Sequence, residues 1–138
     1  MEKKPLKIMA KNPQDLDILS ACLQDALIPL KEATYDKTQK RFVLLANRYK
    51  WEEDHLPQKE GSRTHAGISF ENIEEAQFTG LDFLKKKSLN LSLLRIHHEE
   101  PYVYITFSKK ASIRLKTTDL KIKLRDAHIP WPAKIPEH

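Results

Sequence analysis

The chain is poor in the residues that mark the most recognisable functional sites. It has one cysteine and three glycines among 138 residues. An internal disulfide framework, a cysteine-based zinc site and a glycine-rich phosphate loop are therefore excluded. The longest uninterrupted apolar run, residues 42–46, is far shorter than the roughly 20 residues that a membrane span needs. Residues 1–5 lack the apolar segment of a signal peptide. These absences indicate a cytoplasmic protein that has no membrane partner.

The composition is that of one folded domain. Apolar residues make up 40% and charged residues 31% of the chain, which is typical of a soluble globular protein. At this length we expect a single domain over residues 1–138 with one core. Residues 130–138 form a proline-rich C-terminal tail within it, because Pro130, Pro132 and Pro136 cannot continue a helix or an inner strand.

One segment carries the signals of a helix. Asn12 can cap a first turn, and Pro13 suits the first helical position. Leucines then recur at helical spacing, so the pattern predicts a helix over residues 13–26 that packs against a sheet. The residues expected to be buried there are Leu16, Leu19, Leu23 and Leu27.

Most of the remaining chain alternates apolar and polar residues, as strands do. Residues 120–124 show the clearest alternation, and residues 42–46 are apolar on both faces, which predicts a central strand covered on both sides. The pattern gives about eight strands, and their short links require antiparallel neighbours. We expect an α+β fold that is mainly antiparallel β, with one N-terminal helix. The sheet is then strongly curved, folded into a sandwich, or closed into a partial barrel.

The end of the strand over residues 41–51 is the best candidate for a ligand-binding surface. Donors with several N–H groups, aromatic rings and a carboxylate follow one another there, at a point where a strand leaves the core. A similar cluster lies near the C-terminus. The candidate ligand-binding residues are Asn47, Arg48, Trp51, Glu52, Arg114, Asp126 and Trp131. The alternative is structural: Trp51 closes the end of the core, and Arg48 pairs with Glu52 at the surface.

The excess positive charge lies in the last quarter of the chain. The net charge is +5, and residues 109–138 account for all of it with eight basic and three acidic residues. Clustered basic charge can bind a polyanion, and Tyr102 and Tyr104 could stack the bases of a single strand. The candidate polyanion-binding residues are Lys109, Lys110, Arg114, Lys116, Lys121, Lys123 and Arg125. A solvated strand face that happens to use lysine is the favoured explanation, because a net charge of +5 is modest. No nucleic-acid motif accompanies them, so we do not expect nucleic acid as a partner.

No catalytic or metal-binding arrangement stands out in the sequence. His97 and His98 are adjacent, and adjacent residues of a strand point to opposite faces. Cys22 lies beside the apolar stripe of the helix, where cysteine usually behaves as a small apolar residue. An enzyme would need a pair that the fold brings together, such as His128 with Asp126. We expect no metal, no cofactor and no catalytic residue, and we lean against an enzyme.

Several short segments follow one another in a distinctive order. They are residues 5–10, 15–16, 20–26, 41–42, 47–52, 113–115, 124–126 and Trp131. Their order resembles an uncharacterised family of small alphaproteobacterial proteins that is classed as a domain of unknown function. The resemblance spans nearly the whole chain and implies a bacterial cytoplasmic protein, without implying an activity.

These observations favour a small non-catalytic cytoplasmic binding or assembly module. Its partner would be another protein or a second copy of this chain. One alternative is a polyanion-binding or nucleic-acid-binding protein that uses the basic C-terminal face. A second alternative is an enzyme whose site is assembled only in the fold.

Overall fold

The computed structural model describes residues 6–49, 63–80 and 90–126. The proline-rich tail expected over residues 130–138 lies outside these ranges. The elements in chain order are β1 (Lys7–Ala10), α1 (Pro13–Cys22), β2 (Leu27–Pro29), a 3-10 helix η1 (Leu30–Glu32), β3 (Thr34–Asp36), β4 (Arg41–Tyr49), β5 (Arg63–Phe70), β6 (Glu75–Thr79), β7 (Asn90–Glu99), β8 (Tyr102–Phe107), β9 (Ser112–Lys116) and β10 (Ile122–Asp126).

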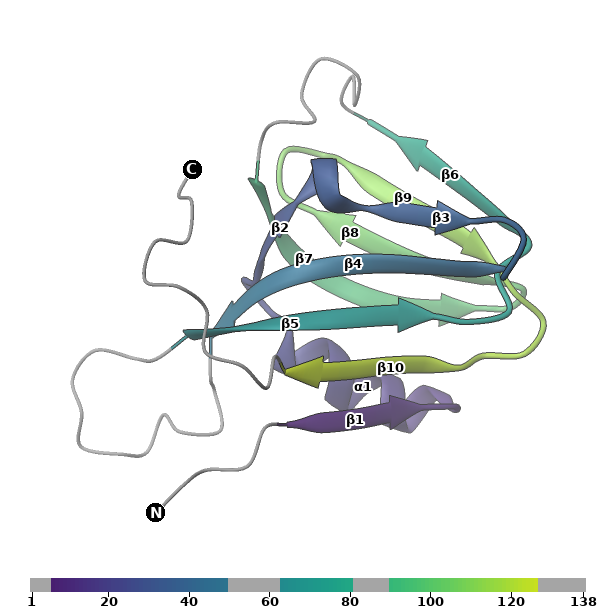
Figure 1. Ribbon diagram of the computed structural model, residues 1–138, viewed down its shortest axis with the longest axis horizontal. Coiled ribbons are helices and arrows are strands. Elements are labelled where there is room, and N and C mark those ends of the chain that lie inside the picture. The colour runs from purple at the N-terminus through teal and green to yellow at the C-terminus, as the bar shows by residue number, and fades with distance from the viewer. Residues whose placement is uncertain (1–5, 50–62, 81–89, 127–138) are drawn as a thin grey trace.

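All ten strands belong to one antiparallel sheet. Its order is β1-β10-β5-β4-β2-β7-β8-β9-β6, and β3 pairs with β4 as an additional strand. The short β2 connects the two halves, since it pairs with β4 on one side and with β7 on the other. Figure 1 shows β3, β4, β5, β10 and β1 as a front layer, with β7, β8 and β9 behind it. Within the described residues the edge strands β1 and β6 do not pair with each other, so the curved sheet is open.

The predicted α+β class, the mainly antiparallel sheet and the N-terminal helix are confirmed. The described residues form ten strands, where the sequence indicated about eight. Two of the ten, β2 and β3, contain three residues each and are too short to show alternation.

An apolar core of described residues lies between the two layers. Phe42 and Phe70 of the front layer face inward, with ring centroids 5.9 Å apart. Ile105 and Ile113 of the back layer are equally buried and belong to the same cluster. Helix α1 packs against β1 and β7. It therefore contributes to the core where the edge of the front layer approaches the back layer.

The start of α1 matches the sequence signals. The side chain of Asn12 accepts a hydrogen bond of 2.8 Å from the backbone N–H of Asp15, and Pro13 occupies the first turn. This cap satisfies one of the N–H groups that have no partner within a helix. The predicted burial of Leu16, Leu19 and Leu23 is confirmed.

The predicted end of the helix, at residue 26, is wrong. Helix α1 ends at Cys22, and Asp25 adopts a left-handed conformation with φ of 66°. The backbone N–H of Leu93 donates to the carbonyl of Ala26, which draws the following residues into β2. The expectation that Leu27 is buried with the helical stripe is therefore also wrong, because Leu27 lies in β2 and is 36% exposed.

Candidate functional site

Two of the predicted site residues meet inside the protein. Arg48 points inward near the end of β4, and Asp126 is the last residue of β10. The guanidinium donates two hydrogen bonds to the carboxylate, from Nε to Oδ1 at 2.8 Å and from Nη2 to Oδ2 at 2.9 Å. Arg48 is fully buried and Asp126 is 5% exposed. Sequence analysis singled out both residues, and the structure brings them together as a bidentate ion pair.

This ion pair connects three strands. The backbone N–H of Leu6 also donates to Oδ2 of Asp126, at 3.0 Å, and the N–H of Asp126 donates to the carbonyl of Leu6. Both carboxylate oxygens thus accept hydrogen bonds from the protein itself. Such charge-assisted, two-pronged contacts are stronger and more directional than neutral hydrogen bonds. The pair therefore holds the ends of β4 and β10 and the entry into β1 in one arrangement.

The other predicted ligand-binding residues do not join this pair. Asn47 lies on the outer face of β4, where its Oδ1 accepts a hydrogen bond of 2.9 Å from Nε of Arg63. Arg114 lies on β9, in the other half of the sheet. Trp51, Glu52 and Trp131 lie outside the described residues, and so does His128, the histidine considered as a partner for Asp126.

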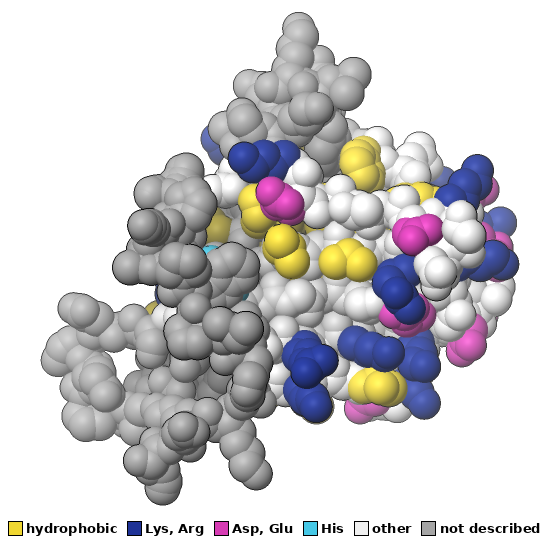
Figure 2. All heavy atoms as spheres, in the orientation of Figure 1, with side chains coloured by type: hydrophobic (Ala, Val, Ile, Leu, Met, Phe, Trp, Pro, Cys, Tyr) yellow, Lys and Arg dark blue, Asp and Glu magenta, His cyan; other side chains and the backbone are white. Residues whose placement is uncertain are grey.

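The outer face of the front layer is a better candidate for a binding surface than the residues predicted from the sequence. The strand register places four residues in one row across β1, β10, β5 and β4. Lys7 pairs with Arg125, Arg125 with Gly67, and Gly67 with Leu45. The neighbouring row contains Met9, Lys123, Ser69 and Val43. In Figure 2, hydrophobic side chains lie near the centre of this face, with Lys and Arg side chains below and to the right of them.

Gly67 lies inside β5 although the fold does not require a glycine there. Its φ is outside the left-handed region, and a Cβ added to it would meet no heavy atom within 4 Å. Gly80 is the opposite case, because its φ is 106° and a Cβ would collide with the carbonyl of Lys110. A glycine within a strand costs about 0.5–1 kcal/mol relative to alanine. Such a glycine often marks a place where a ligand or another chain approaches the backbone.

The surroundings of Gly67 are apolar on one side. Leu45 is 37% exposed, Val43 is half-buried, and Leu27 lies diagonally across from Leu45 on β2. Within the described residues, α1 packs against β1 and β7 and leaves this face uncovered. The prediction that the strand over residues 42–46 is covered on both sides is therefore wrong for its outer face. The sequence provides an apolar surface, and no described element of the chain covers it.

The surroundings of Gly67 are basic on the other side. Lys7 stands directly opposite Arg125, and like charges in this position destabilise an antiparallel pair. Lys123 is exposed two residues before Arg125. Burial lowers the pKa of His65, further along β5, below its ordinary value. The imidazole therefore adds no charge at neutral pH, and Lys7, Lys123 and Arg125 supply the positive potential.

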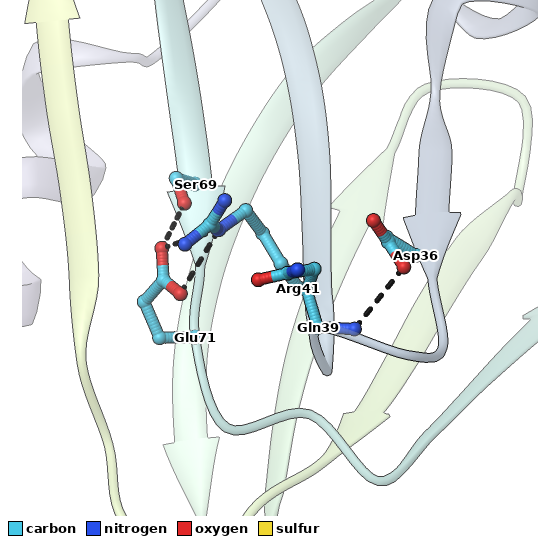
Figure 3. Close-up of polar contacts among 5 residues, drawn as sticks. All are labelled: Asp36, Gln39, Arg41, Ser69 and Glu71. Atoms are coloured by element: carbon cyan, nitrogen blue, oxygen red, sulfur yellow. Dashed lines mark hydrogen bonds and ion pairs between the residues drawn. The ribbon is translucent and has the colours of Figure 1, made fainter.

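A polar network lies at the far end of this face (Figure 3). Nε of Arg41 is 3.0 Å from both carboxylate oxygens of Glu71, and the Ser69 hydroxyl donates to the same carboxylate. Burial alone would raise the pKa of Glu71. The hydrogen bonds from Ser69 and Arg41, together with the charges of Arg41 and Lys123, outweigh it and hold that pKa below its ordinary value. Glu71 is therefore ionised at neutral pH and balances the charge of Arg41.

The predicted polyanion-binding residues are divided between the two layers. Lys123 and Arg125 lie on β10 with Lys121 just before it, whereas Arg114 and Lys116 lie on β9. Lys109 and Lys110 form the turn between β8 and β9. Strands β10 and β9 are second and eighth in the sheet order, so the seven residues do not form one face.

Sequence reasoning missed Gly67, Lys7 and Leu45. The sequence contains one weak indication of Gly67: it is the only residue without a side chain in the regular alternation of residues 64–70. The described part of the chain contains no group of three His, Cys, Asp or Glu residues placed to hold a metal ion. None of its helices is long and apolar enough to span a membrane.

The fold and this surface define a small α+β protein with an open, curved antiparallel sheet, in which no described element covers the outer face of β4, β5 and β10. The chain belongs to the family described as "Protein of unknown function (DUF2948)", whose model matches residues 6–138. This match confirms the resemblance to a domain of unknown function; the alphaproteobacterial origin stays a prediction. No curated protein and no solved structure matches the chain.

Proposed function

We propose that the protein is a non-catalytic binding or assembly module that docks another protein on the outer face of its front layer. The observation that carries the proposal is Gly67, an open position in a central strand between Leu45 and Arg125. Protein interfaces combine an apolar centre with a polar rim. On this face, Leu45 belongs to the apolar centre and Lys7 to the rim. We propose the bacterial cytoplasm as its compartment, on the family resemblance.

The charges of this face select the kind of partner. Lys7, Lys123 and Arg125 favour a partner with acidic side chains around its contact surface. A second copy of this chain fits poorly, because a two-fold interface would bring the same basic residues together. We therefore propose a different protein, with an apolar side chain that occupies the space above Gly67 and acidic residues beside it.

The buried pair supports this surface from beneath. Arg48 and Asp126 fix the ends of β4 and β10, two of the strands that carry the docking residues. In this proposal they act by positioning and do not touch the partner. Asn47, on the outer face of β4, lies at the border of the docking surface.

Comparative capture with a Gly67→Val variant tests the proposal. Valine suits an exposed strand position and meets no neighbour there, so the fold should persist while the space above Gly67 is filled. The matched control is Ile18→Ser, which removes a side chain that is 57% exposed on α1. Proteins captured from a lysate of the source organism are quantified for the wild type and both variants.

We expect at least one acidic protein that the wild type and Ile18→Ser capture equally and that Gly67→Val captures about tenfold less, an affinity difference of about 1.4 kcal/mol. Its capture should weaken as salt is raised, because the basic rim is exposed. The proposal is wrong if every captured protein binds Gly67→Val as well as it binds the wild type.

The enzyme interpretation receives no comparable support. Both oxygens of Asp126 are engaged by Arg48 and Leu6. The polyanion interpretation keeps support for only part of its predicted set, the residues near the turn between β8 and β9.

A further inference from the structure

The outer face of the back layer carries a second, chemically different surface. His97 on β7, Tyr104 on β8, Arg114 on β9 and Gln77 on β6 form one row across four strands. Tyr102 lies in the next row, opposite Glu99 and Lys116. The side chains of His97, Tyr102, Tyr104 and Arg114 are half-buried, so each presents part of its surface on this face.

The rings of this face contact one another. His97 stacks on Tyr104 with centroids 5.1 Å apart and planes at 12°, and Tyr104 meets Tyr102 edge to face at 6.0 Å. The guanidinium carbon of Arg114 lies 4.3 Å from the centroid of Tyr102, and its Nη2 donates to Oε1 of Gln77 at 2.6 Å. We call His97, Tyr102, Tyr104 and Arg114 the aromatic strip.

A basic turn lies beyond one end of the aromatic strip. Between the strip and the turn, the sheet presents the small side chains of Thr106 and Ser112. In the turn, Lys109 and Lys110 both have φ of 60°, and both are exposed. We call these two residues the lysine turn.

Lysine is an unfavourable residue type for the backbone conformation of this turn. A tight hairpin turn with two left-handed residues favours Asn-Gly, and a residue with a Cβ costs roughly 1–2 kcal/mol in that conformation. Residues held in such conformations concentrate at binding and catalytic sites. The choice of lysine at Lys109 and Lys110 thus places two ammonium groups at this point at the expense of stability.

The charge of this face is positive overall. Its basic residues are Arg95, Lys109, Lys110, Arg114 and Lys116, against Glu75 and Glu99. Five basic residues against two acidic residues attract a polyanion. The aromatic strip adds a second kind of contact, since its rings can stack with the flat faces of unpaired bases.

We propose that this face binds single-stranded nucleic acid, a partner that the sequence alone did not lead us to expect. Bases stack on the aromatic strip, and phosphates contact the lysine turn and Arg95. A duplex fits less well, because its bases already stack on one another and it presents phosphates, sugars and base edges but no free base faces. The surface lies on the other layer from Gly67, so this proposal and the protein-docking proposal succeed or fail separately.

Fluorescence anisotropy with three labelled probes of about 12 nucleotides tests this proposal: oligo(U), oligo(dT) and a mixed-sequence duplex. We expect micromolar binding of a single strand near 0.15 M salt, with weaker binding of the duplex. Three phosphate contacts, at Lys109, Lys110 and Arg95, would give a slope of about −2 in log K against log salt. A preference for oligo(U) identifies RNA as the ligand, and a preference for oligo(dT) identifies DNA; both outcomes support the proposal.

Two variants separate the phosphate contacts from the stacking contacts. Lys109→Asn with Lys110→Gly suits the turn, so the fold should be retained while the salt slope becomes shallower by about 1.4. Tyr104→Leu keeps an apolar side chain and removes the ring, so affinity should fall between about 5-fold and 150-fold with the slope unchanged. The matched control is Lys31→Gln with Lys37→Gln, which removes two exposed charges elsewhere and should bind as the wild type does.

Three results would overturn the proposal. The first is the absence of micromolar binding by either single strand near 0.15 M salt, where charges beyond about 8 Å are screened. The second is tighter binding of the duplex. The third is that the lysine-turn variant and Tyr104→Leu, each still folded by its melting temperature, bind as strongly as the control variant.

Discussion

Replacing Asp126 with alanine removes one partner of a buried ion pair and leaves the other in place. The Arg48 guanidinium, fully buried, loses acceptors at 2.8 and 2.9 Å. The N–H of Leu6 loses its acceptor at 3.0 Å. Removing one partner of a buried ion pair costs about 3–5 kcal/mol. A domain of this size has a free energy of unfolding of roughly 5–15 kcal/mol, so the variant should lose a large share of its stability.

Urea denaturation followed by circular dichroism measures this loss. With a slope of about 1.5–2 kcal/mol per molar urea, the midpoint should fall by about 2 M. The loss should be the same at about 0.1 M and about 0.5 M salt, because a buried pair is little screened. Combining Asp126→Ala with Arg48→Met removes the buried charge as well, so the double variant should be more stable than Asp126→Ala alone.

Either of two results would refute this reasoning. One is a loss below about 1 kcal/mol for Asp126→Ala, which is the range of an exposed pair. The other is a double variant whose loss equals the sum of the two single losses, since residues that interact directly do not behave additively.

Three further outcomes follow from burial and charge. Leu19→Ala and Leu23→Ala should each lower the free energy of unfolding by about 2–5 kcal/mol. Leu27 is 36% exposed, so Leu27→Ala should lower it by less than about 1 kcal/mol. Equal losses for the three variants would show that the buried face of the helix is wrongly placed. The folded-state pKa of Glu71 is below its ordinary value of 4.5, so its contribution to stability is present above that value and is lost as the pH falls through the folded-state pKa. The difference in stability between the wild type and Glu71→Gln, measured by urea denaturation, should therefore shrink from pH 7 to the acid range, and a constant difference would contradict the assignment. Gly67→Val should leave stability unchanged or raise it by about 0.5–1 kcal/mol, and a loss above about 1 kcal/mol would mean that the fold itself requires glycine there.

Local signals predicted the beginning of the helix but not its end. Asn12 and Pro13 act within one turn, so their effect can be read directly from the sequence. Ala26 and Leu27 continue the helical spacing, and nothing nearby in the chain contradicts it. The strand there depends on the backbone hydrogen bonds that Asp25 and Ala26 form with Leu93, and a sequence pattern does not reveal a contact across that many residues.

The candidate site was only partly predictable for a similar reason. Arg48 and Asp126 are 78 residues apart in the chain, and the sequence indicated both as polar residues at strand ends. Their meeting depends on the sheet order, in which β5 lies between β4 and β10. The significance of Gly67 depends on the same order, because only the register reveals that Leu45 and Arg125 flank an open position.

The basic C-terminal quarter shows how clustering in sequence differs from clustering in space. Lys116 and Lys123 are close in the chain, but β9 and β10 lie in different layers because the chain crosses between the halves of the sheet. Lys7 comes from the other end of the chain and joins Arg125 on β10. Charge along the sequence therefore indicated the right residue types and the wrong grouping.

Site-specific photo-crosslinking from position 45 tests the docking proposal most directly. A photoreactive phenylalanine analogue replaces Leu45, beside Gly67, and the same analogue at the exposed position Ile18 on α1 serves as the control. We expect an adduct from position 45 only, with a different protein whose crosslinked segment contains acidic residues. Adducts shared by both positions, an adduct with a second copy of this chain, or the absence of any adduct from position 45 would contradict the proposed function.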